Sequence, residues 1–490
     1  MLKLFILLCL QVSFITYANE NLCSPTATIG KKYYVSPNGV DYKADGSFDT
    51  PWKTIKYALY KIPDGSTLMV KPGTYTGRVR IEKSFQKGLL IKSEIPYRAT
   101  LTHNQRVLAL LDNASNITIE GFEITHNSPT SSPLVVHIDG GGRESVKNIT
   151  LRNNIIHDSY NNDLLKVNYG AENITVECNM FYNQGDSDEH IDINSVANIT
   201  VQDNIFFNDF PKGNRKITNK SSSYIVVKDS NDDADRFHGS ENIEIRRNIF
   251  LNWQGSHGQG FILIGEDGKP YYEAHNVNIY NNLMIGNSPL SMRSPLMIKG
   301  AKDIQFFNNT IVGDLPSNAY AIRVTKEQKN LKPTNITLRN NIWSDPTGTM
   351  GMGEYESDLD FSDTLRHQIG SYNLNNNLYW NGNIALPYSL FDSINPSSDE
   401  QKIIINPHLS DNSALYTPYW NSNTKQFKDG SFDIRSAFLR LVSFYGVPKF
   451  RLNDNHPTQQ VELLLSKKDI LGNKRTPPHT LGAYHLDIKK

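Results

Sequence analysis

One short phrase recurs along the middle of the chain: Asn or Asp, an apolar residue, a polar residue, then another apolar residue. The phrase starts at Asn116, Asn148, Asn173, Asn198, Asn242, Asn276, Asp303 and Asn335, at spacings of 32, 25, 25, 44, 34, 27 and 32 residues. A period of this length indicates stacked units, each of which buries its apolar face against a neighbour. The repeat therefore constrains the fold more than any other feature.

Each phrase alternates apolar and polar residues, which is the pattern of a half-buried strand. A turn and a second short apolar pair follow, such as Ile155-Ile156, and no stretch in this region has a sustained helical period. Short strands, tight turns and variable coil length predict an all-β fold, a single-stranded right-handed parallel β-helix. The longer spacings predict loops that protrude from one coil, where function tends to lie.

A second series of asparagines follows the phrases at a constant distance of six residues. It comprises Asn154, Asn179, Asn204, Asn248, Asn282, Asn309 and Asn341, and Asn377 extends it. In stacked coils these amides would lie above one another, each donating to the next carbonyl and satisfying buried turn groups. We interpret the series as a scaffold ladder rather than a row of ligand-binding amides.

The flanks differ from the repeat and divide the chain into four parts. Residues 1–18 read as a signal peptide, 19–31 as an N-terminal arm, 32–382 as the β-helix and 383–490 as a C-terminal extension and cap. Residues 51–59 predict a short helix that caps the open N-terminal end, and residues 469–484 are expected to cover the other end.

The first residues predict export. Lys3 is the charged head of a mostly apolar stretch over residues 2–15 that is too short to span a bilayer. We therefore expect a secreted or periplasmic protein with no membrane contact after signal removal. A retained anchor helix is the alternative. Cys23 and Cys178 remain after cleavage, and they either pair or stay as free thiols.

The charge balance excludes some partners. The chain of 490 residues carries 50 Lys+Arg and 50 Asp+Glu, so no overall field attracts nucleic acid or an anionic membrane. We expect a monomer that contacts no nucleic acid.

Stacking also predicts where chemistry lies. In the strand before each phrase, the polar residues should face outward and form two columns along one sheet. One column reads His137, Lys166, Asp192 and Val226, and the other reads Asp139, Asn168, Asn194 and Lys228. Ionisable side chains thus concentrate between residues 137 and 228, which we take as the candidate site.

Acidic residues gather in the turn that leads into the third of these coils. Asp188, Glu189 and Asp192 lie there, and Asp163 is expected on the coil beneath. Clustered carboxylates repel unless a cation neutralises them, and oxygen ligands of this kind suit Ca²⁺. The alternative is a solvated acidic turn that Lys166 neutralises.

A Ca²⁺ site beside a lysine suits one reaction on acidic sugars. The metal would bind the sugar carboxylate, a base would remove the proton alpha to it, and the glycosidic oxygen would leave by β-elimination. Lys228 and Lys166 compete for the role of base, and His137 and His190 are further candidates.

Both ends of the chain resemble a known family. Residues 33–39, 45–51 and 70–75 are similar to the starting unit of secreted β-helix polysaccharide enzymes, nearest to the pectate lyases of polysaccharide lyase family nine, and residues 469–484 resemble a common ending. The resemblance implies that Asp163, Asp188, Glu189 and Asp192 bind Ca²⁺, with Glu189 replacing an aspartate. It also implies Lys228 as the catalytic lysine, although the family's lysine lies among glycines and this one does not.

Three classes of function remain open. The first is a carbohydrate-active enzyme on a uronic-acid polysaccharide, a Ca²⁺-assisted lyase or a related epimerase. The second is a non-catalytic carbohydrate-binding β-helix protein, and the third is a hydrolase that uses paired carboxylates such as Asp139 and Asp192.

Overall fold

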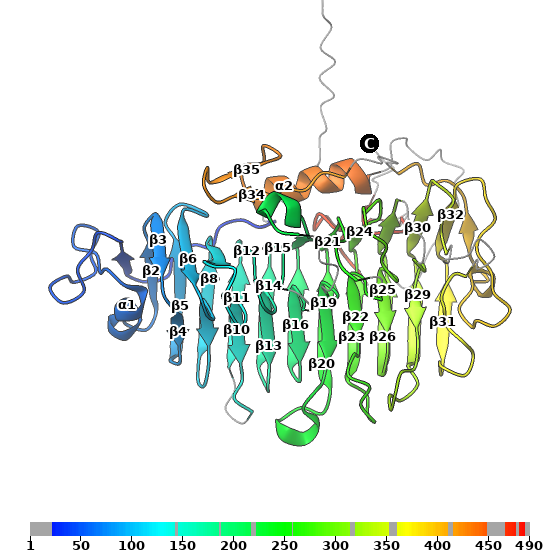
Figure 1. Ribbon diagram of the computed structural model, residues 1–490, viewed down its shortest axis with the longest axis horizontal. Coiled ribbons are helices and arrows are strands. Elements are labelled where there is room, and N and C mark those ends of the chain that lie inside the picture. Colours follow the sequence, from blue (N-terminus) through cyan, green and yellow to red (C-terminus); the bar gives the residue numbers. More distant parts are fainter. Residues whose placement is uncertain are drawn as a thin grey trace, which may run out of the picture.

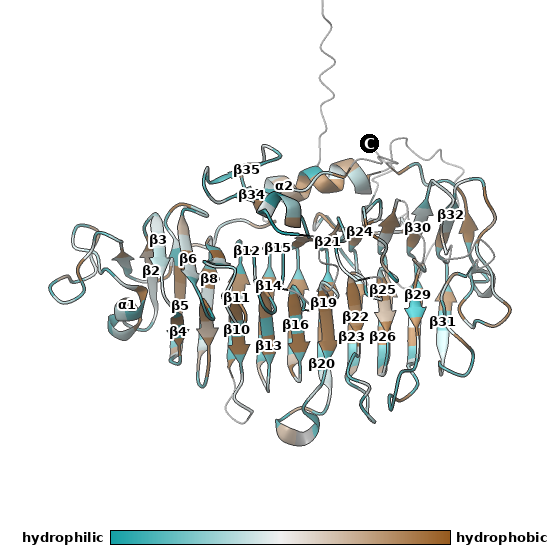
Figure 2. Ribbon diagram, in the orientation of Figure 1, coloured by the Kyte–Doolittle hydropathy of each residue, from teal (hydrophilic) through white to brown (hydrophobic). Residues whose placement is uncertain are grey.

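The computed structural model describes residues 22–142, 146–185, 188–216, 222–256, 258–313, 319–351, 360–409, 415–447, 466–476 and 480–485. Three parallel sheets run along an elongated molecule, and most coils contribute one strand to each sheet in turn (Figure 1). This is the predicted right-handed parallel β-helix. The strands are rich in hydrophobic residues (Figure 2), and their buried apolar side chains form one continuous core.

Sheet A contains the repeated phrases. Its twelve strands, in order of stacking, are β1 (Lys32–Val35), β2 (Ser66–Val70), β5 (Ser84–Ser93), β8 (Ser115–Glu120), β11 (Lys147–Arg152), β14 (Glu172–Glu177), β17 (Ala197–Gln202), β20 (Ser240–Arg246), β23 (Ala274–Tyr280), β26 (Ala301–Phe307), β29 (Thr334–Arg339) and β31 (Tyr372–Asn375). The phrases stack in register, as Ile149 pairs with Ile117 on one side and Ile174 on the other.

Sheet B follows sheet A within each coil. Its twelve strands are β3 (Gly73–Thr76), β6 (Ala99–His103), β9 (Glu123–His126), β12 (Ile155–His157), β15 (Met180–Tyr182), β18 (Ile205–Phe207), β21 (Ile249–Phe250), β24 (Leu283–Ile285), β27 (Thr310–Val312), β30 (Ile342–Asp345), β32 (Leu378–Asn381) and β33 (Ile403–Ile404).

Sheet C completes the coil. Its nine strands are β4 (Val79–Ile81), β7 (Leu108–Leu110), β10 (Val136–Asp139), β13 (Leu165–Asn168), β16 (Ile191–Asn194), β19 (Ile225–Lys228), β22 (Ile262–Ile264), β25 (Leu296–Ile298) and β28 (Arg323–Val324).

The predicted N-terminal helix is α1 (Ile55–Lys61), and it lies at the first end of the stack in Figure 1. Thr54 caps it by accepting from the backbone N–H of Tyr57, and Ile55, Ala58 and Leu59 are buried in the interior of the β-helix. The helix therefore shields the apolar edge that the first coil would otherwise expose.

The asparagine ladder is present and continuous from Asn154 to Asn377. Asn204 is typical: its Nδ2 donates to Asn248 Oδ1 at 3.0 Å and to the carbonyl of Val176 at 2.9 Å. Its Oδ1 accepts the backbone N–H of Asn179 at 2.8 Å. The last rung ends on Asp399, whose Oδ2 accepts from Asn377 Nδ2 at 2.9 Å. All of these amides are buried, so the ladder satisfies turn groups that water cannot reach.

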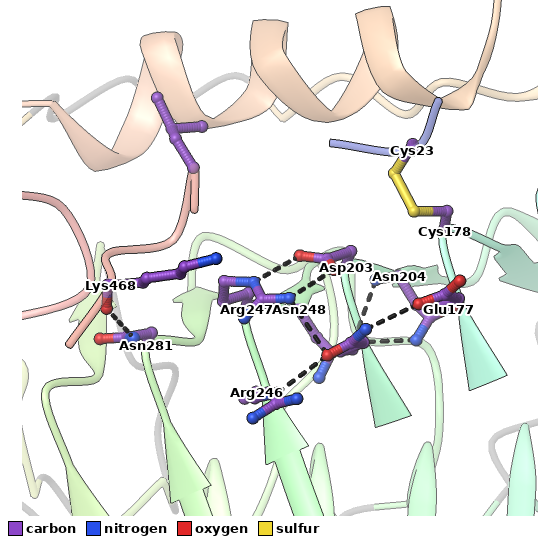
Figure 3. A network of polar contacts seen from close by, with 12 residues as sticks. Cys23, Glu177, Cys178, Asp203, Asn204, Arg246, Arg247, Asn248, Asn281 and Lys468 are labelled. Atoms are coloured by element: carbon purple, nitrogen blue, oxygen red, sulfur yellow. Dashed lines mark hydrogen bonds and ion pairs between the residues drawn. A yellow bond between two sulfur atoms is a disulfide. The ribbon is translucent and has the colours of Figure 1, made fainter. Parts of the chain in front are cut away.

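The N-terminal arm is tied to the stack by a disulfide between Cys23 and Cys178, which settles the open question of those cysteines (Figure 3). The bridge lies beside a row of ion pairs on sheet A, in which Arg247 binds Asp203 with both oxygens at 2.7 Å. The signal peptide predicted at residues 1–18 lies outside the described residues. No helix among the described residues is long and apolar enough to cross a membrane.

The C-terminal segment lies in a different place from the one expected. The C-terminal segment lies along the outside of sheet B (Figure 1). It comprises the strand pair β34 (Trp420–Asn421) and β35 (Gln426–Phe427), helix α2 (Ile434–Leu441), a π-helical turn (Val442–Gly446), and residues 466–476 and 480–485. Short 3₁₀ turns complete the helices, at Phe210–Gly213, Asp232–Ala234 and Pro396–Ser398.

The expectation that residues 469–484 cover the far end of the stack is therefore wrong. Arg475 donates to Asn281 Oδ1 at 2.9 Å, and the N–H of Gly482 donates to the carbonyl of Asn340 at 2.9 Å, both in the flank of the stack. The reason is apolar burial, because the outward side chains of sheet B, including Met180, Tyr182, Ile205 and Phe207, need a cover. We name this covering segment, residues 415–447, 466–476 and 480–485, the C-terminal arm.

Candidate functional site

The two predicted columns are present on sheet C. His137, Lys166, Asp192 and Val226 occupy the same register on β10, β13, β16 and β19. The second column aligns Asp139, Asn168, Asn194 and Lys228 in the same way. The register of the coils thus brings together residues that are up to 91 positions apart in the sequence. Further along the sheet the first column becomes apolar, as Val226, Leu263 and Met297 form a buried cluster.

Three carboxylates meet at the turns that lead into these strands. Asp163 precedes β13, and Asp188 and Glu189 precede β16, so they come from adjacent coils. Each offers an oxygen within 4.8 Å of the others. The backbone N–H of Glu189 donates to Asp163 Oδ1 at 3.0 Å, which fixes the two turns relative to each other. We name Asp163, Asp188, Glu189 and Asp192 the acid cluster.

The charged forms of carboxyl groups in the acid cluster are disfavoured, because these groups are buried close to one another. Burial, followed by the charge of Asp163, raises the pKa of Asp188 to about 7. The same two causes raise the pKa of Glu189 well above its usual value, and burial also raises that of Asp163. Carboxyl groups with these shifts bind either protons or a cation more readily than ordinary surface acids do.

Asp192 links the acid cluster to Lys166. Lys166 forms an ion pair with Asp192 Oδ2. Burial alone would lower the pKa of Lys166, but the charges of Asp192 and Asp163 raise it. Asp192 Oδ1, by contrast, is buried and has no hydrogen-bond partner among the described residues. Buried carboxylate oxygens are normally satisfied, so this free oxygen fits a place for a ligand.

Lys228 lies one coil further on and has acidic partners of its own. It donates to Glu266, and its Nζ lies 3.9 Å from Asp267. Burial would lower the pKa of Lys228, but the charges of Asp192, Glu266 and Glu189 raise it above its usual value. Lys228 is therefore protonated in this arrangement, and any use of it as a base requires that some of this negative charge be neutralised first.

Sequence reasoning missed Glu266 and Asp267, and it missed the residue that places them. Glu273 is fully buried, and its Oε2 accepts the backbone N–H groups of Glu266 and Asp267, both at 2.9 Å. Its Oε1 accepts from Lys269 N–H at 3.1 Å. The available signal was the acidic pair Glu266-Asp267 shortly after β22 (Ile262–Ile264), the strand that pairs with the β19 strand of Lys228.

The two histidine candidates lie in different environments. His190 is fully buried, its ring stacks on Tyr224 with centroids 4.2 Å apart, and its Nε2 contacts Asn208 Oδ1 at 3.0 Å. Burial lowers its pKa to about 3. The proposal of His190 as a base is wrong, because the ring is part of the core. His137 stays on the outer face, where its Nε2 contacts Asn168 Oδ1 at 2.9 Å.

The donor set fits a hard divalent cation. The acid cluster offers only carboxylate oxygens, from two adjacent coils, and one of these oxygens is buried without a partner among the described residues. Ca²⁺ takes several oxygen ligands in flexible geometry, and carboxylates provide both the charge and the atoms. The residues that would hold such an ion are Asp163, Asp188, Glu189 and Asp192.

Comparison with known proteins places the fold. No protein-family model matches the chain, and no curated protein matches it. Among solved structures, a GH136 lacto-N-biosidase from Eubacterium ramulus is similar with a TM-score of 0.51 and 12% identity, covering 77% of this chain and 67% of the other. Pectate lyase Pel9A has a TM-score of 0.45 and 14% identity, covering 94% and 97%. The A-module of the mannuronan C-5 epimerase AlgE4 from Azotobacter vinelandii has a TM-score of 0.41 and 13% identity, covering 70% and 91%. At these identities the likeness shows the parallel β-helix alone.

Proposed function

We propose that the chain is a carbohydrate-active enzyme that cleaves a uronic-acid polysaccharide by Ca²⁺-assisted β-elimination. The observation that carries the proposal is the acid cluster itself. Asp163, Asp188 and Glu189, from adjacent coils, offer oxygens within 4.8 Å of one another, and the buried Oδ1 of Asp192 has no partner in the described part of the chain. Lys166 and Lys228 lie beside them. Such a combination of oxygen ligands and cations on an outer sheet face suits an anionic polymer. The resemblance to family nine lyases and the parallel β-helix of the solved structures agree with it.

The residues divide the chemistry between them. When bound, Ca²⁺ supplies positive charge that makes the proton alpha to a sugar carboxylate more acidic. A lysine amine removes that proton from C5, the electron pair forms the C4–C5 double bond, and the C4–O bond breaks with proton transfer to the leaving oxygen. Lys228 matches the family's lysine, and Lys166 is the alternative base. Both lysines lie on sheet C, along which we propose that the polymer binds.

A cation held by the acid cluster would also lower the pKa of the base. Glu189 and Asp192 contribute to the raised pKa of Lys228, so neutralising their charge lowers that pKa toward a value at which the amine is a useful base. Glu266 keeps Lys228 in place during this change, because its contact is independent of the acid cluster.

The test is activity of the purified protein on uronic-acid polymers, with and without EDTA. A lyase produces unsaturated ends that absorb near about 235 nm, and an epimerase changes the uronate composition without this absorbance. We expect Asp188→Asn and Lys228→Gln to reduce the rate by about 10²–10⁴-fold, while Asp49→Asn, an exposed carboxyl in the N-terminal loop, leaves it unchanged. Binding of the polymer with no product and no effect of EDTA would instead identify a non-catalytic carbohydrate-binding protein.

We also propose that the mature protein is secreted or periplasmic. The apolar stretch at residues 2–15 and the Cys23–Cys178 disulfide support this, because disulfides persist in oxidising compartments. N-terminal sequencing of the exported protein should give a start near residue 19. A full-length N-terminus retained in the membrane fraction would show an anchor instead.

A further inference from the structure

A cavity lies between the C-terminal arm and the turn that joins β5 to β6. Its volume is about 630 Å³, within the range of small-molecule sites. It is lined by residues 95–98 on one side and by Trp420, residues 425–427 and residues 430–433 on the other. None of these residues belongs to sheet C or to the acid cluster, so the cavity is separate from the candidate site.

The floor of the cavity is aromatic. Tyr97, Trp420 and Phe427 pack edge to face, with ring centroids 5.1–5.8 Å apart, and all three are buried. The rim is apolar and open, since Phe432 is 91% exposed and Ile95 is 50% exposed. Large exposed apolar side chains around a cavity mark a place where a ligand or partner binds.

Two polar groups of the cavity have no partner among the described residues. The Nε1 of Trp420 is buried and lacks an acceptor there, although a buried indole N–H usually has one. Arg98 is exposed at the rim, and its guanidinium forms no ion pair within the described part of the chain. The other charged residues of the lining are engaged: Lys425 with Glu123, and Asp433 as the cap of α2.

We propose that this cavity binds one uronate unit of an anionic polysaccharide, as a second binding site apart from catalysis. The exposed ring of Phe432 presents an apolar surface to the C–H face of a pyranose, and Arg98 offers a charged donor for the carboxylate. The indole Nε1 of Trp420, which has no acceptor among the described residues, lies in the floor beneath them. The charge left free in this described lining is positive, so an acidic sugar is favoured over a neutral one. Binding here would hold a polymer on the protein between cleavage events at sheet C, a role that rests on the proposed function.

The variant Arg98→Gln with Phe432→Ala tests the cavity without disturbing the buried floor, because both side chains are exposed. Tyr42→Ala with Arg366→Gln is the matched control, since these residues are also exposed and lie elsewhere. Each pair is introduced into protein that carries Asp188→Asn, so that the sugar is not consumed. The probes are oligogalacturonate, oligomannuronate and a neutral cello-oligosaccharide, measured by calorimetry and tryptophan fluorescence.

We expect the test pair to weaken binding of at least one uronate oligomer by about tenfold or more, and the control pair to leave it unchanged. Equal binding by test and control proteins would overturn the proposal, and so would binding of the neutral sugar as tight as that of the uronates. Sedimentation velocity provides a further check, since a dimer that Phe432→Ala dissociates would assign the cavity to a second copy of the chain instead. If no polymer is cleaved but uronate binding depends on Arg98, the result supports the proposed uronate site in the cavity and contradicts the proposed lyase activity.

Discussion

Replacement of Asp188 by asparagine should stabilise the metal-free protein at alkaline pH. The pKa of the Asp188 carboxyl rises from 3.8 to about 7 in the folded protein, through burial and the charge of Asp163. A carboxyl of this kind binds its proton more tightly in the folded state than in the unfolded state. The stability it contributes is therefore complete below about pH 4 and is lost as the pH rises through 7.

The magnitude follows from the shift. A change of about three pKa units corresponds to about 4 kcal/mol, at about 1.4 kcal/mol per unit. Asp188 is partly accessible to solvent, which screens its interactions, so we halve the value and expect about 2 kcal/mol at pH 8. The introduced amide carries no charge at any pH, and for this reason the gain of Asp188→Asn should be near zero at pH 4.

The assay is urea unfolding in EDTA at pH 4 and pH 8, with Asp49→Asn as the control for loss of an exposed carboxyl. Addition of Ca²⁺ at pH 8 should stabilise the wild-type protein more than the variant, because the ion neutralises the same charge. A variant less stable than the wild type at pH 8 in EDTA would refute the reasoning, as would a gain of equal size at both pH values. Either result would mean that the acid cluster is not under electrostatic strain.

The scaffold gives three further predictions. Asn204→Ala removes the partners of the buried backbone N–H and amide N–H of Asn179 and of the carbonyl of Val176. Urea unfolding should therefore show a free energy of unfolding lower by about 3–6 kcal/mol, whereas the exposed Asn198→Gly should lower it by less than about 1 kcal/mol. Reduction of the Cys23–Cys178 bridge, or Cys178→Ser, should lower stability by about 3–5 kcal/mol because it opens a loop of 155 residues; an unchanged denaturation midpoint would contradict this. Arg475→Ala should loosen the C-terminal arm before the β-helix unfolds, because Arg475 binds Asn281 on the stack. Hydrogen exchange and proteolysis should become faster in the arm, while the asparagine ladder stays protected.

The parts of the fold that repeat were predictable from sequence. The phrase at Asn148 and its copies predicts the strands of sheet A, and the constant offset of six residues predicts the ladder at Asn154 and Asn179. The register then follows, because identical positions in successive coils must stack. Lys166 and Asp192 meet for this reason alone, 26 residues apart.

The parts that do not repeat were not predictable in the same way. The C-terminal arm docks through single contacts such as that of Arg475, which follow no period. One signal was available: sheet B strands such as Met180-Phe181-Tyr182 are apolar at every position, so both faces must be covered. The carboxylate of Glu273, which organises the turn of Glu266, is one acid among 50 acidic residues, and only the folded backbone shows which amides it collects.

The balance of charge around the acid cluster is the strongest reason to expect a cation there. Six carboxylates, from Asp163, Asp188, Glu189, Asp192, Glu266 and Asp267, surround the amines of Lys166 and Lys228. Two ammonium groups cannot neutralise six ionised acids, so the excess negative charge must be removed either by proton uptake at Asp163, Asp188 and Glu189, whose pKa values are raised, or by a bound cation. A solvated acidic turn would place these groups in water, yet Asp163, Glu189 and Asp192 are each less than 5% exposed. Carboxylates buried in this number are normally paired or coordinate a metal, which agrees with the proposal that a divalent ion binds here.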